Sequence, residues 1–228
     1  SRIGVVIPCY RTEQSIAAVV AGIPEYVDTI IAVNDASPDG TQAALEAIAS
    51  PRLVVLRHEH NQGVGGALAT GYAEALRREL EVVVKVDGDG QMAPEGILAL
   101  VLPIVEGRCD YAKGNRFLHA RELRGMPALR KLGSVALTFI TKFASGYWQV
   151  FDPQNGFVAI SRDHLASLDL ERLRSRRYFF ENEMLIQLNV LGARVLDCPM
   201  PARYRGEASS MKVSRVLLYF PYFFLHGF

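Results

Sequence analysis

Cysteine, long apolar runs and any excess of charge are all scarce in this sequence. Cys9, Cys109 and Cys198 lie far apart and form no CxxC pair, which argues against a disulfide framework and favours a reducing compartment. No apolar run reaches the roughly 18–20 residues of a membrane-spanning helix. The formal net charge of only +1 creates no broad electrostatic field, so no nucleic-acid partner is expected.

The sequence pattern also indicates neither a signal peptide nor an internal linker. The chain enters a strand pattern at once, so we expect no signal peptide. No repeat and no Pro/Gly/Ser-rich stretch divides the 228 residues, which are enough to bury a substantial core. We expect one domain over residues 1–212, followed by an apolar segment over residues 213–228.

Strand-like and helix-like patterns alternate through the first half of the chain. Short β-branched runs separated by helical periodicity are typical of βαβ units and of a parallel sheet. We therefore predict an α/β fold with a mostly parallel central sheet flanked by helices. The predicted strands cover residues 2–8, 27–33, 53–57 and 82–86, and the predicted helices cover 13–21 (with Thr12 as N-cap), 41–49 and 64–78.

The second half has a less regular pattern. A helix predicted over residues 129–144 carries four polar side chains at spacings of four, four and three, which form one stripe. These side chains are Arg130, Ser134, Thr138 and Thr141. The other predicted elements are a charged loop over 118–127, helices over 94–106, 163–168 and 181–191, and strands over 111–115, 156–160 and 194–198.

The strand predicted over residues 82–86 is followed by Asp87-Gly88-Asp89-Gly90-Gln91. Ligands of open α/β sheets bind at the carboxyl ends of such strands. Two carboxylates one residue apart, a glycine for close backbone approach and a nearby amide oxygen suit Mg²⁺ or Mn²⁺ better than zinc. The alternative is an Asp-Gly turn, in which these residues are favoured for conformational reasons alone.

Polar clusters also follow the other three strands of this region, at Pro8–Tyr10, Asn34–Asp35 and Asn61–Gly63. In a parallel sheet these strand ends lie on the same edge, so their recurrence predicts a binding cleft there. His58 and His60 precede the last cluster. Zinc would need further ligands that the sequence does not supply, so we interpret both histidines as loop residues.

Five segments together resemble family 2 glycosyltransferases with the GT-A fold, a Rossmann-like α/β architecture. They are VVIPCYRTEQSI, VNDASPDGT, NQGVGGA, VKVDGDGQM and DPQNGF, and they run through most of the chain. Within that family the sequence looks most like the dolichyl- and polyprenyl-phosphate sugar transferases. Their aspartate motif is also followed two residues later by Gln, and a tail similar to RYRGE at residues 203–207 occurs in them.

The resemblance implies a nucleotide-sugar donor site with Mn²⁺ or Mg²⁺ as cofactor. Asp89 and Gln91 would hold the metal, and Asp89 would be catalytic because the ion neutralises charge on the diphosphate leaving group. Asp87 would contact the nucleoside. The other implied nucleotide-binding residues are Pro8, Tyr10 and Glu13 at the base and ribose, Asp35 as a hydrogen-bond partner of the base or ribose, and Gly65 with Ala67, where the next helix approaches the nucleotide.

A lipid-phosphate acceptor needs cations more than a base, because its second pKa of about 6 leaves it mostly ionised at neutral pH. The resemblance implies that Arg116, Arg130 and Ser134 form the catalytic acceptor-phosphate site. Arg203 and Lys212 resemble the family's late basic motif near the diphosphate, although the spacing before Lys212 is longer than usual. Solvated surface charge is the alternative interpretation of each cation.

Glu181 and Glu183 occupy the region where relatives with hydroxyl acceptors carry a Glu-Asp base motif. Asn182 interrupts the pair in this sequence. Glu183 could be a catalytic base, or both glutamates could cap the following helix, where acidic side chains are favourable. In the resembling enzymes Asp152 and Asn155-Gly156 would shape the sugar or acceptor pocket.

Residues 213–228 are rich in aromatic side chains and have few polar groups. The segment is too short to span a bilayer, and we expect an apolar helix at the membrane interface, where Tyr and Phe are favoured. The alternatives are a helix docked on the domain, a dimer contact, or the start of a membrane region. The membrane surface is therefore an expected partner, and oligomerisation is left open.

The expected function is inverting transfer of a sugar from a UDP- or GDP-linked donor to undecaprenyl or dolichyl phosphate, at the cytoplasmic face of a membrane. One alternative is a family 2 transferase that acts on a glycan hydroxyl in polysaccharide synthesis. Another is a nucleotide-sugar-binding module without catalysis, against which Asp89 and Gln91 argue. A nucleotidyltransferase would begin with a Gly-rich, Arg-containing loop, whereas this chain has Pro8-Cys9-Tyr10.

Overall fold

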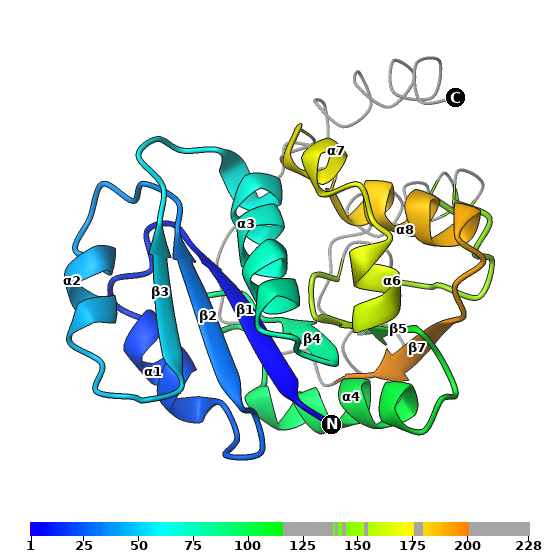
Figure 1. Cartoon of the computed structure of the whole chain (residues 1–228), viewed down its shortest axis with the longest axis horizontal. Helices are drawn as coiled ribbons and strands as arrows, with labels where there is room; N and C mark the ends of the chain where they lie inside the picture. The colour runs from blue at the N-terminus through cyan, green and yellow to red at the C-terminus, as the bar shows by residue number, and fades with distance from the viewer. Residues whose placement is uncertain (116–138, 140, 143–144, 153–154, 176–179, 201–228) are drawn as a thin grey trace, which may run out of the picture.

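A computed structural model describes residues 1–115, 139, 141–142, 145–152, 155–175 and 180–200. A mixed sheet of seven strands runs through it in the order β3-β2-β1-β4-β6-β5-β7. Figure 1 shows the first four of these strands, β3, β2, β1 and β4, side by side. Neighbouring strands are parallel except at β6, which is antiparallel to β4 and β5. The strands are β1 (Ile3–Cys9), β2 (Thr29–Asn34), β3 (Leu53–Arg57), β4 (Val82–Lys85), β5 (Tyr111–Asn115), β6 (Val158–Ser161) and β7 (Val195–Pro199).

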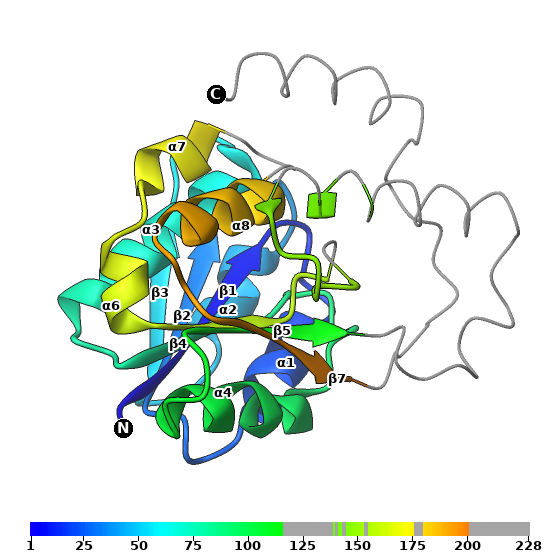
Figure 2. The ribbon, with the colours of Figure 1, turned by 90° about the vertical axis from the view of Figure 1, so that its right-hand side faces the viewer.

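Helices cover both faces of this sheet, which gives the molecule three layers (Figure 2). One face packs against α1 (Ile16–Gly22), α2 (Thr41–Glu46) and α4 (Ile97–Val105), with a short 3-10 turn at Pro94–Gly96 before α4. The other face packs against α3 (Gly63–Arg77), α6 (Arg162–Ala166), α7 (Leu170–Ser175) and α8 (Phe180–Val190).

The central strands are buried on both faces. In β1, Val5 and Ile7 belong to the core on the α1 side and Val6 to the core on the α3 side, and all three are 0% exposed. Parallel strands covered on both sides have continuous β-branched runs, because neither face can be polar. Burying each such side chain contributes about 1.5–3 kcal/mol relative to leaving it exposed.

The register of the first four strands brings their carboxyl ends to one edge of the sheet. Cys9 pairs with Asn34, and Asn34 pairs with Arg57 of β3. On the other side of β1, Val6 pairs with Lys85, the last residue of β4. The predicted convergence of four strand ends at one edge is therefore confirmed.

Some boundaries differ from the sequence prediction because side chains make other contacts. α1 begins at Ile16 rather than at residue 13, and its N-cap position is held by Ser15 rather than Thr12. The Thr12 backbone N–H donates to Thr41 Oγ1 at 2.9 Å, which joins the loops after β1 and β2. Thr12 Oγ1 itself is buried without a hydrogen-bond partner among the described residues.

Two features of the second half were not predicted. The antiparallel direction of β6 depends on strand pairing, which local periodicity does not report. The short helix α7 packs beside α3, and its Leu173 is buried in the core on that side of the sheet. Long-range packing therefore stabilises α7, as it does most short helices in proteins.

Several predicted segments lie outside the described residues. These are the loop over 118–127, most of the helix over 129–144, and the apolar segment over 213–228 with its boundary at residue 212. In the ranges that the structure does describe, no helix has both the length and the apolar character needed to cross a membrane.

We expect Gly71→Ala to destabilise the fold, because α3 leaves no room for a side chain at this position. An added methyl group would collide with Val6 and lie 3.3 Å from Val33 Cγ2, and both valines are in the core. Overpacking of this kind costs about 1–3 kcal/mol in the free energy of unfolding, measured by urea denaturation. As a control, Ala73→Ser at an exposed position of α3 should change stability by about 0.5 kcal/mol or less. Equal stability of Gly71→Ala and wild type would contradict close packing here.

Candidate active site at the carboxyl edge of the sheet

The ends of β1 and β4 pack against each other at this edge. Ser15 Oγ, in the segment after β1, donates to the Gly88 carbonyl at 2.6 Å. A Cβ on Gly88 would lie only 3.3 Å from the Pro8 carbonyl oxygen, so glycine permits the close approach. This packing holds Asp87 and Asp89, the neighbours of Gly88, beside the end of β1.

Asp89 and Gln91 form a turn after β4, and both side chains are exposed. Gly90 between them has a φ of +77°, a left-handed conformation that glycine adopts readily. The Gln91 backbone N–H donates to Asp89 Oδ1 at 3.0 Å, which fixes the turn. The turn thus presents a carboxylate and an amide at the sheet edge.

The oxygen donors of this turn fit a hard divalent cation. Carboxylate and amide oxygens are the ligands that Mg²⁺ prefers, and Mg²⁺ keeps waters and substrate phosphates as its other ligands. Within the described ranges, no group of three or more His, Cys, Asp or Glu side chains could hold a metal ion. Two protein ligands at an open edge suit an ion that shares its coordination with a bound diphosphate.

Asp87 has a buried cationic partner two residues earlier, at the end of β4. Lys85 Nζ lies 2.8 Å from Asp87 Oδ1, and the lysine side chain is 2% exposed whereas the aspartate is 34% exposed. Burial alone would lower the Lys85 pKa, but attraction to Asp87, Glu181 and Asp89 outweighs burial and raises the pKa above its ordinary value. Lys85 is therefore charged at neutral pH.

A second buried lysine, Lys113 of β5, belongs to the same charged region. Its Nζ donates to the Asn155 carbonyl, and Asn155 Nδ2 donates to the Gly114 carbonyl at 2.8 Å. Burial lowers the Lys113 pKa to about 8, because desolvation outweighs the attraction of Glu181 and Asp152. These bonds tie the loop before β6 to β5; the expected contact of Asp152 and Asn155 with a sugar or acceptor stays a prediction.

The two glutamates at the start of α8 have different surroundings. Glu183 is 5% exposed, and its Oε1 lies 2.5 Å from Nε of Arg172 on α7. Glu181 faces the buried lysines instead: burial raises its pKa, while Lys85 and Lys113 oppose that rise. The sequence pattern treated the two residues alike, because a helix start does not reveal which side each faces.

Asp35, after β2, is the centre of a buried hydrogen-bond network. Its carboxylate is 3% exposed and accepts bonds from the backbone N–H groups of Gln62 and Gly63, each at 2.8 Å. His58 Nδ1 lies 2.7 Å from Asp35 Oδ1, and His58 Nε2 lies 2.9 Å from Thr70 Oγ1. The network places a carboxylate at the N-terminus of α3, where negative charge is favourable.

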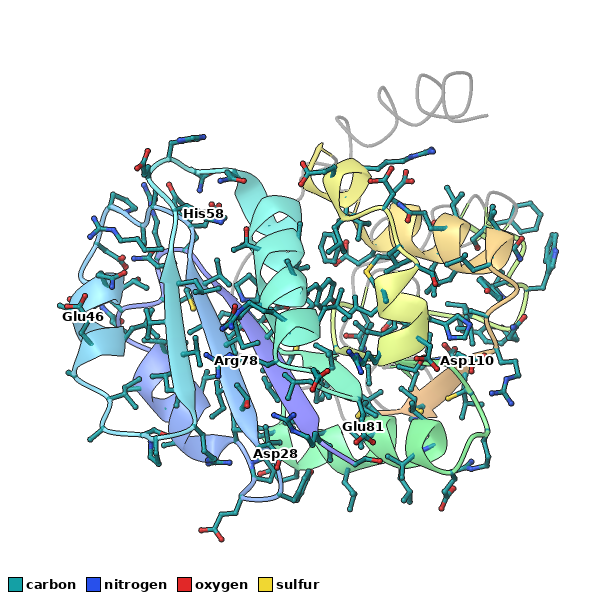
Figure 3. All side chains as sticks on the ribbon, in the orientation of Figure 1. Asp28, Glu46, His58, Arg78, Glu81 and Asp110 are labelled. Carbon is teal, nitrogen blue, oxygen red and sulfur yellow. The ribbon has the colours of Figure 1, made fainter. Side chains whose placement is uncertain are left out.

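His58 lies just beyond β3, as expected of a loop residue, but its side chain is 7% exposed and points to α3 (Figure 3). Sequence reasoning missed its link to Asp35. The alternation of a strand could have indicated that His58 is buried. Successive side chains face opposite sides, so the residue after the exposed Arg57 is expected to face inward. The expected hydrogen bond between Asp35 and a base or ribose stays a prediction. In this structure both carboxylate oxygens accept bonds from backbone N–H groups of the chain.

The other predicted donor-side residues lie at the ends of β1 and the start of α3. Tyr10 is 46% exposed, and Glu13 Oε2 accepts a bond from the Gly40 N–H at 3.1 Å. Gly65 and Ala67 are buried in the first turns of α3. Pro8 pairs with Val33 of β2. Their contact with a nucleotide stays a prediction.

Five residues of the predicted site lie outside the described residues: Arg116, Arg130, Ser134, Arg203 and Lys212. Residue 116 directly follows Asn115, the last residue of β5. Because β5 and β4 are both antiparallel to β6, they run in the same direction, and β5 ends at the edge where β4 ends.

The fold and these strand ends define a class of protein. Open α/β sheets bind ligands in a crevice outside the carboxyl ends of their strands, as nucleotide-binding proteins do. Here that edge presents acidic and amide oxygens together with buried lysines. The chain belongs to glycosyl transferase family 2, whose family model matches residues 4–168. It is therefore a glycosyltransferase.

Two curated relatives match most of the chain. The UDP-N-acetylglucosamine–dolichyl-phosphate N-acetylglucosaminyltransferase of Methanococcus voltae is 31% identical over 234 residues, covering 96% of this chain and 92% of that protein. The polyprenol monophosphomannose synthase of Mycolicibacterium smegmatis is 30% identical over 201 residues, covering 86% of this chain and 75% of that protein. The sequence resemblance to lipid-phosphate sugar transferases therefore extends to named relatives.

A solved structure has a similar fold. Glucosyl-3-phosphoglycerate synthase from Mycobacterium tuberculosis, in complex with Mn²⁺ and UDP-glucose, superposes with a TM-score of 0.72 at 24% identity, covering 96% of this chain and 77% of that one. The same protein was also solved with Mg²⁺ and UDP. The likeness confirms the expected GT-A-like α/β fold.

We expect Lys113 to make stability depend on pH on the alkaline side of neutrality. Its pKa is about 8 in the folded chain against an ordinary value of 10.5, so between these values the unfolded chain binds more protons and stability rises with pH. From about pH 7.5 to about pH 9, the unfolding free energy of wild type should rise by about 1 kcal/mol relative to Lys113→Met. Urea denaturation of both proteins across this range measures the difference. A constant difference would contradict the lowered pKa.

Proposed function

We propose that this chain is a metal-dependent, inverting glycosyltransferase that moves a sugar from a UDP- or GDP-linked donor to undecaprenyl or dolichyl phosphate. The observation that carries the proposal is the exposed Asp89–Gln91 turn beside Asp87, at the sheet edge of a family 2 glycosyltransferase. The acceptor is supported by two relatives that are named for dolichyl-phosphate and polyprenol chemistry and span 96% and 86% of this chain.

On the donor side, Asp87 contacts the nucleoside and Asp89 with Gln91 holds the divalent ion. When bound there, Mn²⁺ or Mg²⁺ neutralises the charge that grows on the diphosphate leaving group. The small residues Gly65 and Ala67 let α3 approach the nucleotide. The base and ribose pocket is completed by Pro8, Tyr10, Glu13 and Asp35.

On the acceptor side, the cations Arg116 and Arg130, with Ser134, position the lipid phosphate, and Arg203 and Lys212 act near the diphosphate. Such a phosphate is mostly ionised at neutral pH, so the transfer requires no general base. This acceptor is consistent with the Glu183 environment. A base must be available to take a proton, whereas Glu183 is buried against Arg172.

The proposed place of action is the cytoplasmic face of a membrane, because the acceptor is a lipid. Residues 213–228 are the proposed contact with that surface, since aromatic side chains favour the headgroup boundary. Whether the segment lies on the membrane or precedes membrane-spanning residues does not alter the proposed reaction.

The reaction is tested by screening UDP- and GDP-sugars against short-chain polyprenyl phosphates with Mg²⁺ and with Mn²⁺. We expect a lipid-linked sugar from at least one pair, and loss of product on chelation. Asp89→Ala should lower the transfer rate by about 10²-fold or more, as removal of a charge-stabilising group does. Asp163→Ala, on the exposed side of α6, is the matched control and should keep wild-type activity. No product with any lipid phosphate would refute the proposed acceptor.

The acceptor class is tested by two substitutions. For a lipid phosphate, Arg130→Ala should lower the transfer rate by about 10²-fold through loss of a charged contact, while Glu183→Gln stays nearly active. Arg108→Ala, an exposed arginine paired with Glu106, is the control for loss of a surface charge. The opposite outcome, with Glu183→Gln inactive but still binding donor, would favour a hydroxyl acceptor.

A further inference from the structure

Lys85 is buried where a central strand of a parallel sheet would ordinarily carry an apolar residue. It is the last residue of β4 and follows Val82, Val83 and Val84, all of which are buried. Residues two apart on an extended chain point to the same side, so Lys85 and Asp87 can meet. Lys85 Nζ lies 2.8 Å from Asp87 Oδ1.

The surroundings of Lys85 leave its ammonium group little freedom. Its Nζ lies 5.2 Å from the centroid of the Phe180 ring at the start of α8. In the loop before β6, a Cβ on Gly156 would collide with Lys85 Nζ and lie 3.3 Å from Asp87 Oδ2. Glu181 adds a further electrostatic attraction. Elements before β6 and at the start of α8 therefore enclose the ammonium group that contacts Asp87.

An ion pair with one buried partner is a weak source of stability. Removing the Lys85 charge from water costs several kcal/mol, and an apolar replacement of similar volume is often as stable. What the pair does supply is geometry, because a rigid, desolvated ammonium group fixes the carboxylate that it binds. Asp87 is 34% exposed, so the carboxylate held by Lys85 still reaches the surface of the sheet edge.

We propose that Lys85 is a positioning residue for donor binding: its ammonium group orients the Asp87 carboxylate toward the nucleoside, and the absence of a side chain at Gly156 makes room for the pair. The inference rests on the proposed function, in which Asp87 contacts the nucleoside. Lys85 acts only through Asp87, which distinguishes this role from a general contribution to the core.

A double-mutant cycle on nucleotide affinity tests the proposal. Isothermal titration with UDP and with GDP, each in the presence of Mn²⁺, gives the dissociation constants of wild type, Lys85→Met, Asp87→Asn and the double variant. Lys85→Met should weaken binding about tenfold in the wild-type background, and should cause no further loss in the Asp87→Asn background. Additive losses, or wild-type affinity in Lys85→Met, would overturn the proposal.

Two further variants separate positioning from folding. Arg78→Met removes a partly buried cation that pairs with Glu74 at the C-terminal end of α3, so it should keep nucleotide affinity within about twofold of wild type. Gly156→Ala keeps both charges but intrudes on the Lys85–Asp87 pair, and should weaken binding as Lys85→Met does. If Lys85→Met does not fold, the nucleotide affinity of Gly156→Ala tests the proposal instead. A folded Gly156→Ala variant with wild-type affinity overturns the proposal.

The same titrations distinguish failure of this inference from failure of the proposed function. Wild-type protein that binds neither UDP nor GDP, with Mn²⁺ or with Mg²⁺, overturns both. Wild-type protein that binds a nucleotide, together with unchanged affinity in Lys85→Met, overturns only the role of Lys85.

Discussion

The parallel register of β1, β2 and β4 is the constraint on which the rest of the structure depends. Both faces of these strands are buried, so a slip of one residue would move every side chain of a strand to the opposite core. This burial fixes the pairing of Val6 with Lys85 and of Cys9 with Asn34. It thereby sets where each strand ends and which loops meet at the carboxyl edge.

The charged groups of the site depend on that same packing. Lys85 and Lys113 occupy positions inside the core. Attraction to carboxylates such as Asp87 and Glu181 outweighs the burial of Lys85, whereas the burial of Lys113 is compensated only in part and its pKa falls to about 8. The network around Asp35 follows the same principle, since the backbone N–H groups at the start of α3 satisfy its carboxylate. Fixed polar groups of this kind need no reorganisation when a charged ligand binds, which is favourable for catalysis.

The placement of the candidate donor-side residues was largely predictable from the sequence, because they lie in short motifs at strand ends. Asp87, Asp89 and Gln91 follow a β-branched run, and the direction of a parallel strand alone places them at the carboxyl edge of the sheet. The acceptor side was less predictable. The contrast between Glu181 and Glu183 arises from their different partners, Lys85 and Arg172, which belong to separate elements. The burial of His58 likewise depends on Asp35, 23 residues earlier in the chain.

The sequence by itself determined the alternation of strands and helices, the sheet edge at which the strand-end motifs gather, and the family. These properties depend on local periodicity and on residue types at fixed spacings, which the chain carries whatever its tertiary contacts. Only the tertiary structure decided the antiparallel direction of β6, the packing of α7, and the pairing of Lys85 with Asp87 next to Gly156. Each of these requires contacts between segments far apart in the chain, and so depends on how the whole sheet is assembled.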